Sequence, residues 1–260
     1  MRNIFLYRIW SWFAWYKRSI SWRGIHPPWL FGLMQSIHQN NPSIAELESL
    51  RKKLKKDRTL IPIVDYGAGS HRVQQTVGDI AKSALKRTKH AVAIAQVADY
   101  IDAQSILEMG TSFGITTAYL AQKNRAVTTL EGNPHIAEIA EKHWDSLGLA
   151  HIQCKQGSFA ESLPSLLQQW ESEMHLGFDL IFIDGHHQGD ALVTYVEQIK
   201  PWLKEGGVLV CDDIHWSPDM EEAWNSLQMD AHWTASADFY EWGLLTTRAG
   251  LTKEAFSIRF

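Results

Sequence analysis

The stretch SILEMGTSFGITTAYLA, residues 105–121, decides the fold. It begins with an apolar run typical of a buried strand, in which Glu108 is the only charged residue. Glycines follow at 110 and 114, and a helical pattern begins after the second one. A strand that turns into a helix at glycines is the start of a nucleotide-binding βαβ unit, in which the helix N-terminus faces the ligand. The stretch therefore predicts further strands and helices in alternation.

Strand-like runs recur along the chain at regular intervals. They lie at 105–109, 126–131, 151–155, 178–184 and 207–212, and helical patterns separate them at 113–123, 134–147 and 187–204. Alternating strands and helices predict a parallel sheet in an α/β fold. The segment WTASADFYEWGLLTTR, residues 233–248, instead contains two strand-like runs almost back to back. It predicts an antiparallel hairpin at a sheet edge.

The charge of the chain is divided unevenly. Residues 1–60 hold 11 Lys and Arg against 3 Asp and Glu, whereas the remaining 200 residues hold 14 against 26. At 260 residues the chain has room for one large domain and an appendage. We therefore expect an aromatic and basic helical extension over residues 1–60, and a main domain over residues 61–260.

The extension begins with IFLYRIWSWFAWYKRSISW, residues 4–22, which contains no acid. Its apolar residues follow helical spacing: Phe5, Ile9, Trp12, Phe13, Tyr16 and Ile20. Arg8 interrupts the apolar run, so no transmembrane helix is expected. No small-residue cleavage site follows, which argues against a signal peptide. The helix either packs on the body or on a second copy of the chain in a homodimer, or touches anionic lipid through residues 1–30; nucleic acid is not an expected partner.

Two glycine turns compete for the role of ligand loop. VDYGAGS, residues 64–70, precedes what reads as one long helical stretch up to residue 100. The turn at Gly110 is followed by a helix and by a strand that ends in Glu131, 21 residues further on. An acid at that distance is where ribose hydroxyls are usually held. The turn at 110 is thus the predicted cofactor turn, and the earlier one is a tight turn or part of a lid.

The carboxylates at the predicted strand ends indicate the kind of cofactor. The dinucleotide pattern G-x-G-x-x-G is not met, because residue 112 is serine. The acids near the strand ends are Glu108, Glu131, Asp184, Asp212 and Asp213. Two unit charges 4 Å apart interact by roughly 4 kcal/mol at an effective dielectric of about 20, so this edge repels a pyrophosphate and suits a cation. S-adenosylmethionine, which carries a sulfonium and an ammonium, fits where NAD does not.

The ordered motifs resemble those of a known family. ILEMGTSFGITTAYLA, TLEGNP, QGSFAESLP, FDLIFIDGHH and GGVLVCDDI occur in the order typical of class I S-adenosylmethionine-dependent methyltransferases. Residues 85–250 are most similar to the branch of small-molecule O-methyltransferases. The resemblance implies a Rossmann-like, seven-stranded, mostly parallel sheet with an antiparallel last hairpin and helices on both faces. It also implies a cofactor half at about residues 100–215.

The resemblance further implies roles for individual residues. Those around the methionine part of the cofactor are Glu108, Gly110, Thr111 and Ser112, with Gly114 allowing close approach of the helix. Glu131 would hold the ribose hydroxyls. Those beside the adenine are Gly132, Asn133, Ser158 and Phe159. Asp184 would lie near the methionyl end.

The acceptor side is implied by two further motifs, FIDGHH and CDDI. In cation-dependent O-methyltransferases, acids at the positions of Asp184, Asp212 and Asp213 bind Mg²⁺ or Mn²⁺, and a base stands three residues after the first. His187 occupies that base position, as a histidine does in macrolide-sugar O-methyltransferases. Many family members carry asparagine where this chain has Asp213. Asp184 and His187 are thus the predicted catalytic residues, and His186 and His215 are weaker candidates for the base.

The function expected is O-methylation of a small-molecule or sugar-like acceptor, with divalent-cation assistance as an added expectation. Two alternatives remain open: a protein of this fold that binds the cofactor without turnover, and an NAD-dependent oxidoreductase. The only cysteines, Cys154 and Cys211, lack metal or redox spacing. A cytoplasmic location, with membrane association as the alternative, is therefore expected.

Overall fold

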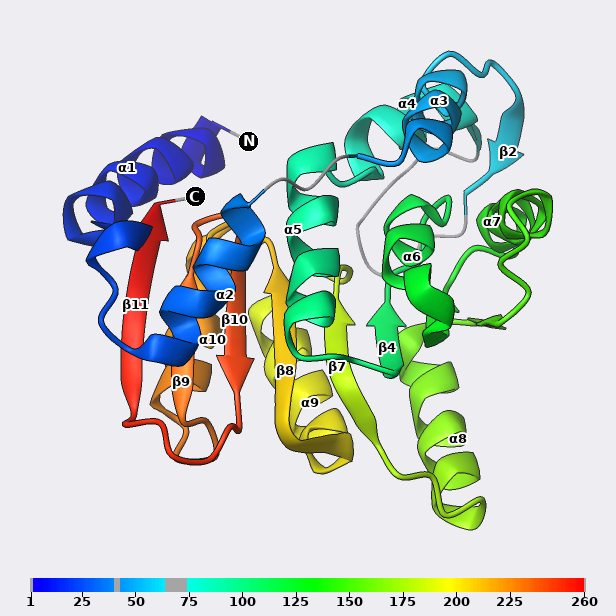
Figure 1. Ribbon diagram of the computed structural model, residues 1–260. Helices are drawn as coiled ribbons and strands as arrows, with labels where there is room; N and C mark the ends of the chain where they lie inside the picture. The colour runs from blue at the N-terminus through cyan, green and yellow to red at the C-terminus, as the bar shows by residue number, and fades with distance from the viewer. Residues whose placement is uncertain (1, 40–42, 64–73, 260) are drawn as a thin grey trace. The chain divides into compact units, whose positions relative to one another are not determined.

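The computed structural model describes residues 2–39, 43–63 and 74–259 (Figure 1). The chain divides into two compact units. The first combines Met1–Gln39 with Leu176–Phe260, and the second is Asn40–His175. Strands and helices alternate in both, as the sequence predicts, so the α/β fold with a mostly parallel sheet is confirmed.

The second unit contains three parallel strands, each followed by a helix. The strands are β4 (Ser105–Met109), β5 (Ala126–Glu131) and β6 (Ile152–Gln156), hydrogen-bonded in that order. The helices that follow them are α6 (Ile115–Leu120), α7 (Pro134–Ser146) and α8 (Phe159–Ser172), with a short 3-10 turn, η2, at Gln122–Asn124. Parallel register places the carboxyl ends of β4 and β5 at one edge, because Met109 pairs with Leu130. The ligand loop therefore begins beside the end of β5.

The same unit begins with smaller elements. They are α3 (Ala45–Leu54), a two-stranded antiparallel sheet of β2 (Leu60–Pro62) and β3 (Gln74–Thr76), α4 (Val77–Ala84) and α5 (Thr88–Tyr100). The expected single helix up to residue 100 was wrong: α4 begins at a cap, where Asp79 N–H donates to the Thr76 hydroxyl, and it ends at Leu85, which is extended. The VDYGAGS turn lies outside the described residues.

In the first unit the strands are hydrogen-bonded in the order β1-β11-β9-β10-β8-β7. The bounds are β7 (Phe178–Ile183), β8 (Leu203–Asp212), β9 (Ala235–Asp238), β10 (Trp242–Thr246), β11 (Glu254–Arg259) and β1 (Ile20–Ser21). Strands β7 and β8 are parallel, and β9 and β10 form the predicted antiparallel hairpin. The hairpin is not at the edge, however, because β11 pairs with β9 and β1 pairs with β11.

Helices α1 (Arg2–Arg18), α2 (Pro28–His38), α9 (Gly189–Ile199) and α10 (Pro218–Met229) complete this unit, with 3-10 turns η1 (Trp22–Gly24) and η3 (Lys200–Trp202). Fully buried tryptophans fill its core at Trp224, Trp233 and Trp242. Gly243 in β10 admits the ring of Trp224, since a Cβ there would lie 2.4 Å from it. Within the described parts of the chain, no helix is long and apolar enough to cross a bilayer.

Helix α1 does pack on the body of its unit, but not through the apolar stripe seen in the sequence. Trp15 is buried, and Ser11 is buried with it. The stripe residues Phe5 and Phe13 are instead more than half exposed, at 66% and 55%. Figure 1 shows α1 beside the C-terminal end of β11. The helix is thus held by its polar face and presents its apolar face outward.

Candidate active site

The loop that follows β4 has a backbone that few residues adopt. Gly110, Ser112 and Gly114 have φ values of 112°, 49° and 75°. The backbone N–H groups of Gly110 and Thr111 donate to the carbonyl of Leu130, at 3.0 and 3.2 Å. The loop is therefore attached to the end of β5.

Glu131 ends β5 and locks this loop. Its Oε2 accepts from the backbone N–H of Ser112 at 2.8 Å, and its Oε1 accepts from that of Asn133 at 2.9 Å. Burial raises the pKa of Glu131 above its usual value, although the backbone N–H bonds act in the opposite direction. A carboxylate oxygen can accept a further hydrogen bond. The side chain of Glu131, the predicted ribose-binding residue, is thus held in place at the end of β5 by its bond to the loop after β4.

Glu108 lies beneath the loop and is fully buried. Its Oε2 accepts from the hydroxyls of Thr117 and Thr129, at 2.5 and 2.7 Å. The Thr111 and Thr129 hydroxyls lie 2.6 Å apart. This carboxylate and its three threonines form a network that joins β4, the loop, α6 and β5. The sequence reading missed Thr117 and Thr129, whose part becomes visible only once β4 and β5 are placed in register.

Gly114 is the N-cap of α6 and packs against α7. A Cβ at this position would lie 2.5 Å from the indole nitrogen of Trp144. That nitrogen also donates to the Gly114 carbonyl at 3.0 Å. At Gly114 it is therefore the Trp144 ring of α7 that approaches the start of α6 closely.

The predicted adenine residues stand at two helix starts. Asn133 caps α7 by accepting from His135 N–H at 3.0 Å, and its amide donates to the Pro62 carbonyl at 2.9 Å. Ser158 caps α8 by accepting from the backbone N–H of Glu161 at 3.3 Å, and its hydroxyl donates to the Glu161 carboxylate at 2.8 Å. Phe159 is half-buried at the first position of α8, and Gly132 lies between Glu131 and Asn133. The three segments of the predicted cofactor site thus come from the ends of β4, β5 and β6.

The loop residues fit S-adenosylmethionine in one further respect. The hydroxyl oxygen of Ser112 is buried, and it has no hydrogen-bond partner among the described residues. A buried polar atom without a partner costs free energy unless a ligand or water satisfies it. Ser112 also sits where the resemblance places the amino-acid part of the cofactor, which carries both donors and acceptors.

In the first unit, Asp184 and Asp212 follow neighbouring parallel strands. Ile183 of β7 pairs with Cys211 of β8, so the two aspartates stand next to each other at the carboxyl ends. Asp212 is buried and Asp184 is half-buried. Adjacent strands lie about 4.8 Å apart, so these two carboxyl groups belong to one polar edge.

His187 forms a pair with Asp213. Nδ1 of His187 lies 3.3 Å from Oδ2 of Asp213, and about a third of each side chain is exposed. Asp213 has a φ of 52°, and its N–H donates to the Glu241 carbonyl at 2.7 Å, which fixes its direction. A carboxylate on Nδ1 holds the imidazole in the tautomer whose Nε2 can accept a proton.

The other two candidate histidines are engaged elsewhere. Nδ1 of His186 lies 2.9 Å from the Tyr195 hydroxyl. His215 is buried, with one ring nitrogen 3.0 Å from Asp238 and the other 3.3 Å from Glu221. Both nitrogens of His215 are thus occupied, which leaves His187 as the accessible base among the three.

The predicted Mg²⁺ or Mn²⁺ site is not confirmed. Within the described ranges, no three His, Cys, Asp or Glu side chains gather as a metal ion requires. The Asp213 carboxylate lies against the ring of His187.

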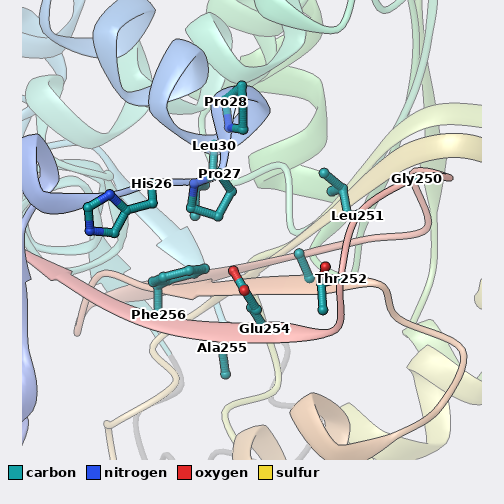
Figure 2. Close-up of a pocket in the computed structure, with 11 residues that line it drawn as sticks. His26, Pro27, Pro28, Leu30, Gly250, Leu251, Thr252, Glu254, Ala255 and Phe256 are labelled. Atoms are coloured by element: carbon teal, nitrogen blue, oxygen red, sulfur yellow. The ribbon is translucent and has the colours of Figure 1, made fainter.

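A pocket of about 530 Å³ in the first unit lies away from these residues. Figure 2 shows Pro27 and Pro28 of one wall facing Glu254 and Phe256 of β11. Ala235 and Glu254, which begin β9 and β11, also line it. Since β9 and β11 run in the direction of β8, their beginnings lie at the edge opposite Asp212. This pocket is therefore not part of the candidate site.

Comparison with known proteins agrees with the fold and the loop. Residues 107–214 match the model of a methyltransferase domain family. No curated protein sequence matches the chain.

Several solved structures share the fold. An O-methyltransferase from Bacillus cereus in complex with S-adenosylhomocysteine has a TM-score of 0.59 at 17% identity, over 82% of this chain and 94% of that one. A methyltransferase from Podospora anserina, also bound to S-adenosylhomocysteine, has a TM-score of 0.59 at 15% identity, over 86% and 98%. An O-methyltransferase of tomaymycin synthesis from Streptomyces achromogenes, bound to S-adenosylmethionine, has a TM-score of 0.55 at 18% identity, over 64% and 82%.

The chain therefore shares its fold with solved methyltransferases, and residues 107–214 are similar to a methyltransferase domain. The resemblance to the O-methyltransferase-like branch, stated from the motifs, is confirmed.

Proposed function

We propose that this protein transfers a methyl group from S-adenosylmethionine to a hydroxyl oxygen of a small-molecule or sugar-like acceptor. The observation that supports the proposal is the bond from Ser112 N–H to the carboxylate of Glu131, which joins the loop after β4 to the residue predicted to hold the ribose. The O-methyltransferase folds found by comparison support the choice of oxygen as acceptor atom.

Each part of the loop has a role in holding the donor. The left-handed turn at Gly110 and Ser112 would receive its amino-acid part, and Glu131 its two ribose hydroxyls. Gly132, Asn133, Ser158 and Phe159 would border the adenine. S-adenosylmethionine supplies a methyl carbon activated by a cationic sulfur. The protein mainly aligns the reactants, which is worth an effective molarity of about 10⁵–10⁸ M in well-oriented reactions.

The first unit supplies the base. The bound donor would give up its methyl carbon to the acceptor oxygen, with the electron pair of the broken carbon–sulfur bond left on sulfur. The acceptor's proton passes to Nε2 of His187, with Asp213 stabilising the imidazolium. Asp184 would lie near the methionyl end, where its charge favours a cationic donor. Cation assistance by Asp184, Asp212 and Asp213 stays a prediction, which activity measured with and without a chelator tests.

Methyl transfer is tested with donor labelled in the methyl group and a panel of hydroxylated acceptors and metabolite extracts. We expect label in an organic product, and a loss of about 10²–10⁴-fold in turnover for His187→Gln, because general-base catalysis typically contributes that factor. The matched control is His186→Gln, whose histidine bonds Tyr195 instead.

Binding of S-adenosylhomocysteine should be unchanged in both variants, since neither histidine belongs to the donor loop. Full turnover in His187→Gln would remove this base from the mechanism. Cofactor binding without any labelled product would favour a binding protein without turnover.

A further inference from the structure

Helix α1 packs on its unit through its polar face and leaves its apolar face exposed, whereas most surface helices do the opposite. Its inward face is polar: the Tyr7 hydroxyl and the Ser11 hydroxyl, the latter at 2.8 Å, both donate to Glu221. The Tyr240 hydroxyl donates to the Arg8 carbonyl at 2.6 Å. Trp15 is the one large residue buried on this side, with its ring 5.5 Å from that of Tyr240. The helix is thus firmly held without using its largest apolar surface.

The outward face of α1 carries a continuous set of exposed apolar side chains. We call it the outer face of α1, and its residues are Ile4, Phe5, Leu6, Ile9, Trp10, Trp12, Phe13 and Tyr16. Phe5, Leu6 and Trp10 are each about two-thirds exposed, at 66%, 64% and 67%. Trp12 is in ring contact with Phe13 and Tyr16, both at 5.1 Å between centroids. An apolar patch of this kind marks an interaction surface, because soluble proteins rarely expose one.

The charges around this face are of one sign. All five charged residues before Glu46 are cations, at positions 2, 8, 17, 18 and 23. Lys17 is exposed beside the outer face, and Arg259 from β11 lies over the Tyr16 ring at 5.1 Å. The rest of the chain from residue 61 onward is strongly acidic, with 26 acids against 14 bases. This face therefore complements an anionic surface.

We propose that the outer face of α1 docks on an anionic lipid bilayer, with Trp10 and Phe13 inserted at the headgroup level. Aromatic and aliphatic side chains flanked by Lys and Arg are the composition of interfacial helices. Anionic headgroups attract such cations and add to the apolar contribution.

The same contacts place the docking face near the candidate base. The Arg8 guanidinium lies over the Trp216 ring at 4.3 Å, and the Trp216 ring lies 6.1 Å from that of His187. Arg18 Nη2 also lies 3.4 Å from the Asp238 carboxylate at the end of β9. Docking would thus bring the carboxyl ends of β8 and β9 toward the bilayer. Lipid binding by α1 does not depend on methyl transfer, and it is measured without donor or acceptor present.

The test is co-sedimentation of the full chain with vesicles of phosphatidylcholine alone and of phosphatidylcholine with 30% phosphatidylglycerol. We expect binding to the anionic vesicles that falls as salt rises from 0.1 to 0.5 M, because exposed charges are then screened. Trp10→Ser/Phe13→Ser should reduce the bound fraction by about tenfold or more. Both side chains are exposed, so the variant should fold, which circular dichroism checks. The matched control is Met174→Ser/Leu176→Ser, which removes two exposed apolar side chains elsewhere and should bind as the wild type does.

Three results would overturn the proposal. One is a wild-type protein that stays in the supernatant with every vesicle. A second is a bound fraction unchanged in Trp10→Ser/Phe13→Ser. The third is a wild-type dimer, by light scattering, that the double variant converts to a monomer while neither protein binds vesicles, since a second copy would then cover this face.

Discussion

At the scale of single residues, Glu131 links the backbone of two segments and still offers oxygen lone pairs. Its bonds to Ser112 and Asn133 N–H explain why an acid, rather than its amide, stands at the end of β5. An amide nitrogen in place of one oxygen would face an N–H donor. The position of Glu131 was predicted from its spacing alone, whereas its hold on the loop could not be, because Ser112 adopts a backbone that sequence patterns do not reveal.

Glu131→Gln should therefore weaken S-adenosylhomocysteine binding by about 10–100-fold, the equivalent of roughly 1.5–3 kcal/mol for a lost charged hydrogen bond. Calorimetric titration measures it. Glu138→Gln on the exposed side of α7 is the control, because its carboxylate pairs only with Lys142 among the contacts described. Equal affinity of Glu131→Gln and the wild type would remove Glu131 from the site.

Gly114 allows backbone strain and crowding to be separated. In Gly114→Ala an alanine must adopt the left-handed backbone of this position, which costs about 1–2 kcal/mol. Its Cβ also clashes with Trp144, which costs about 1–3 kcal/mol more. Gly148 also has a left-handed backbone, with a φ of 70°, but a Cβ there would meet open space. Gly148→Ala should therefore show only the cost of the left-handed backbone. Chemical denaturation should show the larger loss of unfolding free energy for Gly114→Ala. A loss no larger than that of Gly148→Ala would mean that Trp144 moves aside freely.

At the scale of elements, the sequence patterns located the central strands well and the edges poorly. The predicted runs 105–109 and 126–131 coincide with β4 and β5, because buried parallel strands read as continuous apolar runs. β1 and β11 were missed, since β1 is two residues long and pairs with residues more than 200 positions away. α1 was predicted as a helix, but the face that packs on the body was not predicted, because it is set by contacts of its polar side with Glu221, His215 and Tyr240.

The packing of α1 on the body of its unit should contribute a pH-dependent part of the stability through Glu221. Hydrogen bonding by His215, Tyr7 and Ser11 lowers the pKa of Glu221 from 4.5 to about 2. The stabilisation by its charged form is thus complete above pH 4.5 and is lost as the pH falls toward 2. Glu221→Gln should lower the unfolding free energy by about 1–3 kcal/mol at pH 6, and the difference should shrink below pH 4.

Denaturation of both proteins at several pH values gives this difference. Glu222→Gln, an exposed neighbour on α10, should show no such trend. A difference between wild type and Glu221→Gln that grows toward low pH would contradict the assignment.

At the scale of the whole molecule, the chain combines a basic, aromatic extension with an acidic domain that shares its fold with methyltransferases. The ordered motifs were enough to predict the class, because the ends of parallel strands carry the chemistry of this fold. The acceptor could not be predicted, since acceptor contacts depend on loops and appended helices rather than on a strand motif. The outward face of α1 likewise required the three-dimensional contacts, because a helical stripe alone does not say which side is covered.

The most direct test of the central claim is a crystal structure of the full chain with S-adenosylhomocysteine. We predict ribose hydroxyls within hydrogen-bond distance of Glu131, the amino-acid part against Gly110 and Ser112, and the adenine beside Asn133. Density for the nucleoside elsewhere, with these residues uncontacted, would contradict the account.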